Sequence, residues 1–242
     1  MGSSGEILFA GNVFGGYEIL CYTFIIVQLL DKPSLGIQQQ IEKGISILKQ
    51  GGIVAFPTDT VYGLGAGANL PQAIERVYEV KERPRNMALP LLLADVSQIT
   101  RFTESVPPVA WLLIHNFLPG ALTLILSKPS SVPDIITAGG TTIAIRIPAH
   151  PVPVALVKGL GTPIVGTSAN LSGRPSPLTA DEVYSQLGNK VNLIIDGGRC
   201  PGGKESTIVD VTGETPVLLR EGAISIKGLK KVCGSIVFKE GG

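Results

Sequence analysis

The pattern of apolar and polar positions is regular from residue 34 onward. Four apolar residues between Ile37 and Leu48 recur at helical spacing and lead into the apolar run Gly52–Phe56, which predicts a helix followed by a buried strand. Similar patterns predict helices at 72–80, 97–102, 109–117, 152–158, 180–187 and 224–232, and apolar or strand segments at 88–94, 121–127, 142–147, 163–166, 192–196, 207–211 and 217–220. This interleaving predicts an α/β fold, a single-domain twisted open mixed sheet with surrounding helices.

The first 33 residues break this pattern. Residues 1–16 are rich in glycine and serine, and the apolar run at 19–27 is too short to span a bilayer and has no preceding lysine or arginine. We therefore expect neither a membrane helix nor a signal peptide. The predicted organisation is an N-terminal extension over 1–33, disordered or peripheral, a catalytic domain over 34–233 and a C-terminal tail over 234–242.

Composition narrows the possible chemistry. The chain has 242 residues, of which 44% are apolar, so it is long enough for one large core. A formal net charge of +1 means that a nucleic-acid partner would have to meet a local basic patch. Three widely spaced cysteines show no metal-ligand spacing and indicate a reducing, cytoplasmic location. Two histidines leave little from which to build a histidine-rich metal site or a serine–histidine triad.

The segment PTDTVYGLGA at Pro57–Ala66 follows the first strand. Ligands of open α/β sheets bind beyond the carboxyl ends of strands, so we expect a ligand-binding loop here. Hydroxyl side chains can form hydrogen bonds with a ligand, and glycines allow the backbone to approach it closely. The hydroxyls are Thr58, Thr60 and Tyr62, and the glycines are Gly63, Gly65 and Gly67.

Cations gather at the end of the helix predicted over 72–80. Lys81, Arg83 and Arg85 fall within five residues, with a proline that stops the helix. One interpretation is a solvated helix C-terminus, where cations suit the helix dipole. The other is a phosphate site, with lysine as a mobile point charge and arginine as a forked donor. Arg220 is a further cation placed at a strand end.

The segment Thr142–Ile147 alternates cleanly between apolar and polar residues. As a strand, it places its isoleucines in the core and Thr142 with Arg146 on the opposite face. An arginine in so apolar a strand is costly unless it is paired. It could form an ion pair across the sheet, for example with Asp196 or Asp210, or it could bind a substrate carboxylate.

Two further loops carry polar side chains. Ser168 and Asn170 follow an apolar strand and lie two residues apart, so an extended loop would point both the same way. A helix cap or turn would explain them equally well.

The glycine-rich segment at 197–206 is not a P-loop, because Glu205 stands where serine or threonine should bind Mg²⁺ and a strand follows it. This segment places Ser206 immediately before the strand predicted over 207–211.

Together these segments resemble the YrdC-like threonylcarbamoyl-AMP synthases in their short, single-domain form. The motifs run in order from about residue 36 to residue 232: PTDTVYGLGA, KERP, IAIRIP, S-x-N within GTSANLSGRPSP, STIVDV and LLREGAI. Each motif alone is weak, whereas six in order are specific. One departure is Leu92, which stands where many relatives have histidine near the threonine site.

The resemblance implies an enzyme. It would condense L-threonine, bicarbonate or CO₂, and ATP into L-threonylcarbamoyladenylate and pyrophosphate, with Mg²⁺ on the ATP phosphates. A partner transferase would then modify tRNA next to the anticodon, and weak tRNA binding is possible for such a protein. By position, threonine would be held by Thr60, Arg146, Ser168 and Ser206; ATP by Lys81, Arg83, Thr142, Asn170 and Arg220, with Lys81 and Arg83 as the catalytic residues.

Two other functions remain open from the sequence. The first is an RNA-binding module of the same fold without turnover, although such a module would not need the threonine-site residues. The second is a carbamoyl-adenylate enzyme of hydrogenase maturation. Enzymes of that kind are much larger and carry CxxC pairs, which this sequence lacks.

Overall fold

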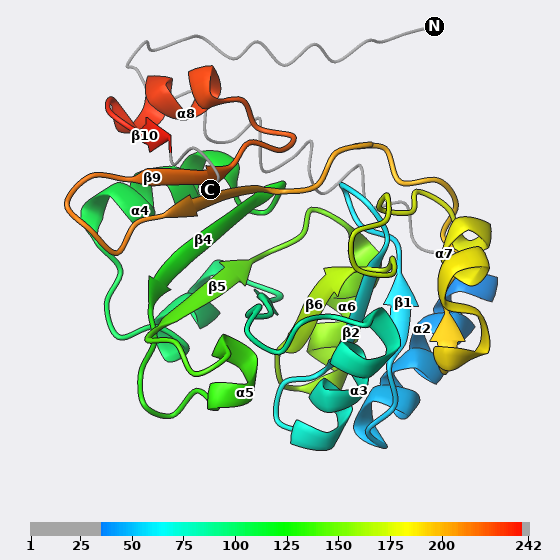
Figure 1. The fold of residues 1–242 in the computed structure, drawn as a ribbon. Helices are drawn as coiled ribbons and strands as arrows, with labels where there is room; N and C mark the ends of the chain where they lie inside the picture. The colour runs from blue at the N-terminus through cyan, green and yellow to red at the C-terminus, as the bar shows by residue number, and fades with distance from the viewer. Residues whose placement is uncertain (1–34, 239–242) are drawn as a thin grey trace, which may run out of the picture. The chain divides into compact units, whose positions relative to one another are not determined.

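The computed structural model describes residues 35–238, so the extension predicted over 1–33 lies outside the described residues. Ten strands form one mixed sheet in the order β10-β9-β8-β4-β5-β3-β6-β2-β1-β7 (Figure 1). The predicted open mixed sheet with surrounding helices is confirmed. The strands are β1 (Val54–Phe56), β2 (Gly63–Gly67), β3 (Leu91–Leu92), β4 (Leu122–Ser127), β5 (Thr142–Arg146), β6 (Ile164–Ser168), β7 (Leu193–Ile194), β8 (Thr207–Asp210), β9 (Val217–Arg220) and β10 (Val237–Phe238).

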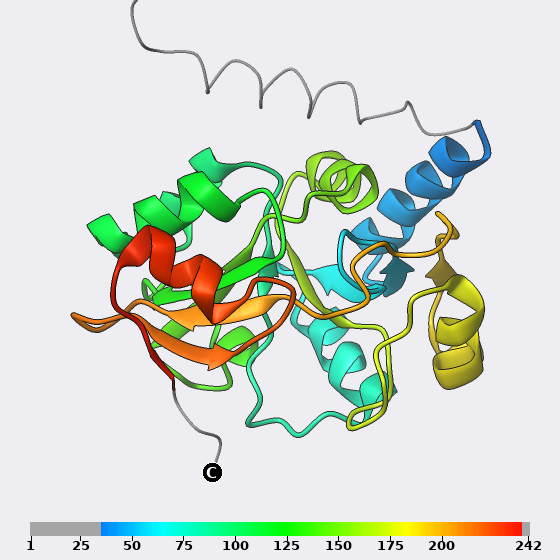
Figure 2. The same ribbon diagram turned by 90° about the horizontal axis from the view of Figure 1, so that it is seen from above.

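Helices cover both faces of this sheet, and α3 lies on the side opposite α6 (Figure 2). Successive residues of a strand point to opposite faces, and β1 shows this directly. Val54 and Phe56 join the core cluster of α2 and α6, whereas Ala55 joins the cluster that contains α3. The helices are α2 (Leu35–Lys49), α3 (Pro71–Lys81), α4 (Pro108–Phe117), α5 (Asp134–Thr137), α6 (Pro151–Leu160), α7 (Ala180–Leu187) and α8 (Ile226–Cys233), with 3₁₀ turns η1 (Val96–Arg101) and η2 (Gly188–Lys190).

The glycine-rich part of PTDTVYGLGA is a strand, so the prediction of a loop is wrong from Gly63 onward. Strand β2 pairs antiparallel with both β1 and β6. A Cβ atom on Gly65 would lie 2.4 Å from Ile164 Cγ2 and 2.8 Å from the Val165 carbonyl oxygen. Glycine is required there by close packing between strands rather than by approach to a ligand.

The remaining differences concern short elements. The apolar run at 88–94 contributes only the two residues of β3, and the segment at 97–102 is a 3₁₀ turn rather than an α-helix. Helix α5 and strand β10 were not predicted, and β10 lies within the predicted tail, parallel to β9. The two strands have two residues each and the two helical elements have four and six, which is too few to show a period. Within the described residues, no helix is long and apolar enough to cross a membrane.

Candidate functional site

A cavity of about 730 Å³ opens on one face of the sheet. It is the face on which Arg146 was predicted to lie, opposite the core-facing isoleucines of the segment Thr142–Ile147. Ile143 and Ile145 of β5 are buried as predicted, while Ala144 and Arg146 line the cavity. Thr123, Ile125 and Ile208 on the neighbouring strands β4 and β8 extend the lining. Loops that follow β1, α3 and β6 supply other lining residues.

Eight of the nine predicted site residues line this cavity: Thr60, Lys81, Arg83, Arg146, Ser168, Asn170, Ser206 and Arg220. They come from six segments of the chain, so only the fold brings them together. The ninth, Thr142, begins β5 two residues before Ala144 and is not among the lining residues. Leu92 does line the cavity and packs on Gly166, where a Cβ atom would lie 2.5 Å from Leu92 Cδ1.

Arg146 is buried and held by three acceptors. Its Nη2 donates to Asp59 Oδ1 at 2.7 Å, its Nη1 to Thr60 Oγ1 at 2.9 Å, and its Nε to the Gly120 carbonyl oxygen at 3.1 Å. The suggested partners Asp196 and Asp210 were wrong, because the ion pair is formed with Asp59. A guanidinium has five N–H donors, so two remain without an acceptor among the described residues.

Thr60 is itself oriented by a small hydroxyl network. Thr58 Oγ1 donates to the Val61 carbonyl oxygen at 2.6 Å, so its contact with Thr60 Oγ1 at 3.0 Å must use the Thr60 proton. The lone pairs of Thr60 Oγ1 therefore face Arg146 Nη1. Tyr62, the third predicted hydroxyl, donates to the Gly198 carbonyl oxygen at 2.8 Å and ties this turn to the glycine-rich loop.

Lys81 is buried, so its interpretation as a solvated helix end is wrong, while a role at the phosphates of a ligand stays a prediction. Its Nζ donates to the carbonyl oxygens of Ser168 at 2.5 Å and Asn170 at 2.7 Å, and to Asn170 Oδ1 at 3.3 Å. The amide of Asn170 in turn donates to the carbonyl oxygens of Leu171 and Arg174. Lys81 thus fixes the end of β6 and the loop after it.

Burial lowers the pKa of Lys81 from 10.5 to about 7, and Arg83 adds to this shift while Glu205 opposes it. Between these two values the unfolded chain binds more protons at Lys81 than the folded chain does. We expect the free energy of unfolding to rise with pH in this window, by at most about 1.4 kcal/mol per pH unit from this group. Urea unfolding of wild type and of Lys81→Met, measured across this pH window, checks the prediction. Equal slopes of the free energy of unfolding against pH in the two proteins would mean that Lys81 has an ordinary lysine pKa.

Arg83 and Arg85 occupy different environments although they share one loop. Arg83 is half-buried, lines the cavity and donates to the carbonyl oxygens of Met87 at 3.2 Å and Ala88 at 2.9 Å. Arg85 is exposed, pairs with Glu75 and lies over the Tyr78 ring. The interpretation as a solvated cation therefore fits Arg85, and a ligand-facing role fits Arg83.

The opposite wall carries Ser206 and Arg220. Ser206 Oγ lies 2.9 Å from Thr123 Oγ1. Arg220 donates to the Ser206 carbonyl oxygen through Nε at 3.2 Å and Nη2 at 2.9 Å, and pairs with Glu205 through Nη1. A second hollow of about 410 Å³ adjoins the cavity and shares Val61, Glu205 and Arg220 with it.

The Sua5/YciO/YrdC family model, described as "Telomere recombination", matches residues 46–222, a range that contains every predicted site residue. The chain belongs to this family.

Individual relatives agree with this assignment. The chain is 43% identical over 203 residues to a threonylcarbamoyl-AMP synthase of Bacillus subtilis, a match that covers 84% of this chain and 59% of the relative. Pyrococcus abyssi Sua5, solved in complex with L-threonine, superposes with a TM-score of 0.80 at 41% identity, covering 82% of this chain and 58% of that chain. The chain therefore spans about three fifths of the length of these two relatives.

A third relative is covered almost completely. Escherichia coli YciO superposes with a TM-score of 0.74 at 33% identity, covering 82% of this chain and 95% of that protein. The fold that surrounds the cavity is therefore the fold of this family.

Sequence reasoning missed three charged residues of this Sua5/YciO/YrdC site. Asp59 stands beside Thr60 in the first motif, and its signal was the need of buried Arg146 for a counter-ion. Arg174 lines the cavity from the loop after β6 and carried no distinguishing signal. Glu205 was noted only as a mismatch to a P-loop, but it is the single carboxylate among the described residues that line the cavity.

Proposed function

We propose that this chain is an L-threonylcarbamoyladenylate synthase. It uses L-threonine, bicarbonate or CO₂, and ATP, and it releases pyrophosphate. The single observation that carries the proposal is that one cavity holds two sets of polar side chains, each suited to a different substrate. Arg146, Thr60 and Ser206 suit a small hydroxy amino acid, and the cations Lys81, Arg83 and Arg220 suit a phosphate chain. The names of the Bacillus and Pyrococcus relatives support the same activity.

Positioning by Arg146 suits the amino-acid substrate. A guanidinium binds a carboxylate through paired N–H donors, and Arg146 keeps two donors beyond its three contacts within the described residues. Because Asp59 and Thr60 fix the guanidinium, little side-chain entropy is lost when the carboxylate binds.

The reaction needs placement and charge neutralisation more than a protein nucleophile. The neutral threonine amine adds to the carbon of CO₂ and releases a proton to solvent, which leaves a carbamate. A carbamate oxygen attacks the α-phosphorus of ATP, and the bond to the β-phosphate oxygen breaks to release pyrophosphate. Cations and backbone donors in a partly closed cavity can stabilise the developing phosphate charge. Arg83 and Arg220 would do so directly, whereas Lys81, whose donors bind Ser168 and Asn170, would act by holding the loop after β6 in place.

Mg²⁺ would accompany ATP as its phosphate counter-ion. Among the described residues, no group of three or more histidine, cysteine, aspartate or glutamate side chains could hold a metal ion. Glu205, a carboxylate that lines the cavity, is paired with Arg220. Mg²⁺ bound to the phosphates of ATP would reduce their negative charge.

The product, L-threonylcarbamoyladenylate, would pass to a transferase that places the threonylcarbamoyl group on tRNA beside the anticodon. Synthesis of the adenylate and its transfer to tRNA would both take place in the cytoplasm. Weak tRNA binding would use the exposed cations around the cavity, and would weaken as salt is raised.

Mass spectrometry of the product tests the activity. Purified protein with ATP, Mg²⁺, L-threonine and ¹³C-bicarbonate should give threonylcarbamoyladenylate that carries the label, together with pyrophosphate. Omission of threonine or bicarbonate should abolish both products. Binding of tRNA without any threonine-dependent release of pyrophosphate would favour the RNA-binding module instead.

A further inference from the structure

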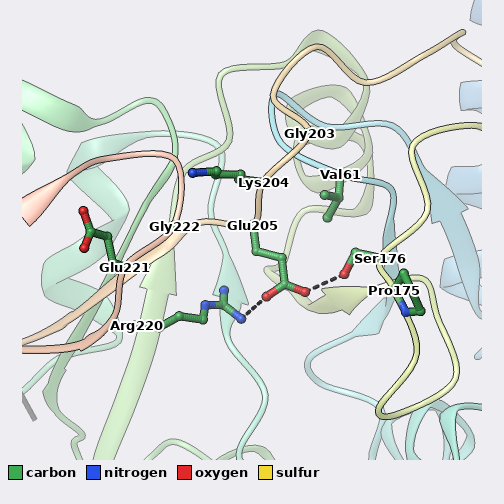
Figure 3. A pocket seen from close by; sticks show the side chains of 9 residues that line it. All are labelled: Val61, Pro175, Ser176, Gly203, Lys204, Glu205, Arg220, Glu221 and Gly222. Atoms are coloured by element: carbon green, nitrogen blue, oxygen red, sulfur yellow. Dashed lines mark hydrogen bonds and ion pairs between the residues drawn. The ribbon is translucent and has the colours of Figure 1, made fainter. Parts of the chain in front are cut away.

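Glu205 joins the two walls of the cavity. Its carboxylate accepts a hydrogen bond from Ser176 Oγ at 2.5 Å and forms an ion pair with Arg220 Nη1. Figure 3 shows the carboxylate between these two side chains, with Ser176 on the loop before α7 and Arg220 at the end of β9. The contact therefore links segments that are far apart in the sheet order.

Charge makes this carboxylate unusual. Within residues 35–238, five basic side chains line the cavity, and Glu205 is the only carboxylate beside them. The cations are Lys81, Arg83, Arg146, Arg174 and Arg220. An acid at the place where phosphate is to bind repels the ligand, so its presence needs another reason. Its contacts give that reason, because they restrain Arg220, a long side chain that otherwise has many rotamers.

Backbone contacts hold Glu205 in place. Its carbonyl oxygen accepts from the Ala223 amide at 2.9 Å. A Cβ atom on Gly222 would lie 2.2 Å from the same oxygen, so the segment after β9 packs directly on the start of β8. Because Ser206 also accepts from Arg220, both ends of the Glu205–Arg220 pair are anchored to one strand start.

We propose that Glu205 is a positioning residue, which holds the Arg220 guanidinium and the loop at 171–177 in place for the phosphates of ATP. This inference rests on the proposed function for the identity of the ligand. Arg220 touches the phosphate, and Glu205 acts through Arg220. The remaining donors of Arg220 are thereby directed into the cavity before the nucleotide arrives, which reduces the ordering cost of binding.

Glu205→Gln keeps the size of the side chain and an acceptor for Ser176, but removes the charge that pairs with Arg220. We expect the Kd for ATP to rise about fivefold, which is the scale of a partly exposed ion pair. The KM for threonine should change less than the Kd for ATP, since Arg146 and Thr60 do not contact Glu205 and only Ser206 of the predicted threonine-binding residues adjoins it. Ser176→Ala should weaken ATP binding by a smaller factor.

A matched control removes a carboxylate from an ion pair elsewhere. Asp134 pairs with Lys128 at 2.7 Å, is 80% exposed and does not line the cavity. Asp134→Asn should leave both ATP and threonine parameters unchanged. Melting temperatures of all variants should stay within about 2 °C of wild type, because exposed ion pairs contribute little to stability.

The closing experiment is a double-mutant cycle on ATP binding, measured by isothermal titration calorimetry with Mg²⁺ and without threonine. Glu205→Gln should weaken binding in the wild type but change it less than about twofold in an Arg220→Ala background. An equal loss in both backgrounds, tighter binding by Glu205→Gln, a lower melting temperature with unchanged Kd, or a wild type that binds no ATP would each overturn the inference. A wild type that binds ATP but forms no labelled adenylate would overturn the proposed function alone.

Discussion

Replacing Arg146 with lysine should raise the KM for L-threonine by about one to two orders of magnitude, while the Kd for ATP stays within a few-fold of wild type. Lysine keeps the positive charge, so attraction of phosphates by the cavity survives. An ammonium cannot reproduce the planar fork that a carboxylate binds through two parallel hydrogen bonds. The turnover number should fall as well, because a misplaced amine presents its carbamate poorly to the α-phosphate.

The structure adds a stability cost to this prediction. Arg146 contacts Asp59, Thr60 and Gly120 at once, and a lysine cannot reach all three with good geometry. Asp59 is largely buried, and a carboxylate in that setting with a weakened partner costs about 1–3 kcal/mol of the free energy of unfolding. Loss of stability alone therefore does not distinguish a structural arginine from a substrate-binding one.

Asp59→Asn provides the control that separates the two roles. Asp59 is not among the residues that line the cavity, yet it forms the ion pair with Arg146. We expect this variant to lose stability by a similar amount but to raise the threonine KM less than Arg146→Lys does, because an asparagine can still accept a hydrogen bond from Arg146 Nη2. Melting temperature and the KM of each substrate decide the matter. Arg146→Lys with lower stability and an unchanged threonine KM would show that Arg146 only supports the fold.

Replacing Arg83 with alanine should weaken use of ATP by about one to two orders of magnitude, which corresponds to about 1.5–3 kcal/mol for a charge-assisted contact to phosphate. Arg83 is half-buried at the cavity and holds the loop through the carbonyl oxygens of Met87 and Ala88. Both the direct contact and the position of the loop should be lost. Initial rates of pyrophosphate release at limiting ATP measure the effect.

Arg85→Ala is the matched control for this prediction. Arg85 lies two residues further along the same loop, is 53% exposed and pairs with Glu75. Its removal takes away the same charge without touching the cavity lining. We expect its rate to stay within about twofold of wild type, since surface ion pairs contribute little. Equal losses in both variants would mean that the general charge of the loop matters, rather than a specific contact by Arg83.

Several features of this protein were determined by the sequence alone. The alternation from Thr142 to Ile147 predicted which face of β5 carries Arg146, because side chains of a strand alternate strictly between its faces. Helix α7 begins and ends where the pattern at 180–187 predicted it. The ordered motifs indicated the family, and eight of the nine residues that they nominated line one cavity. These signals are local in the chain, so a linear reading can find them.

Only the tertiary structure decided the partners of those residues. Asp59 meets Arg146 across 87 positions of the chain, and Lys81 meets the Asn170 carbonyl oxygen across 89. Such pairs depend on strand order and register, for which the sequence offers no local period. Gly65 was interpreted as a ligand contact because glycine suits both a loop and a crowded strand, and only the neighbouring Ile164 distinguishes them. Glu205 likewise acquired a role only when Ser176 and Arg220 were brought to either side of it.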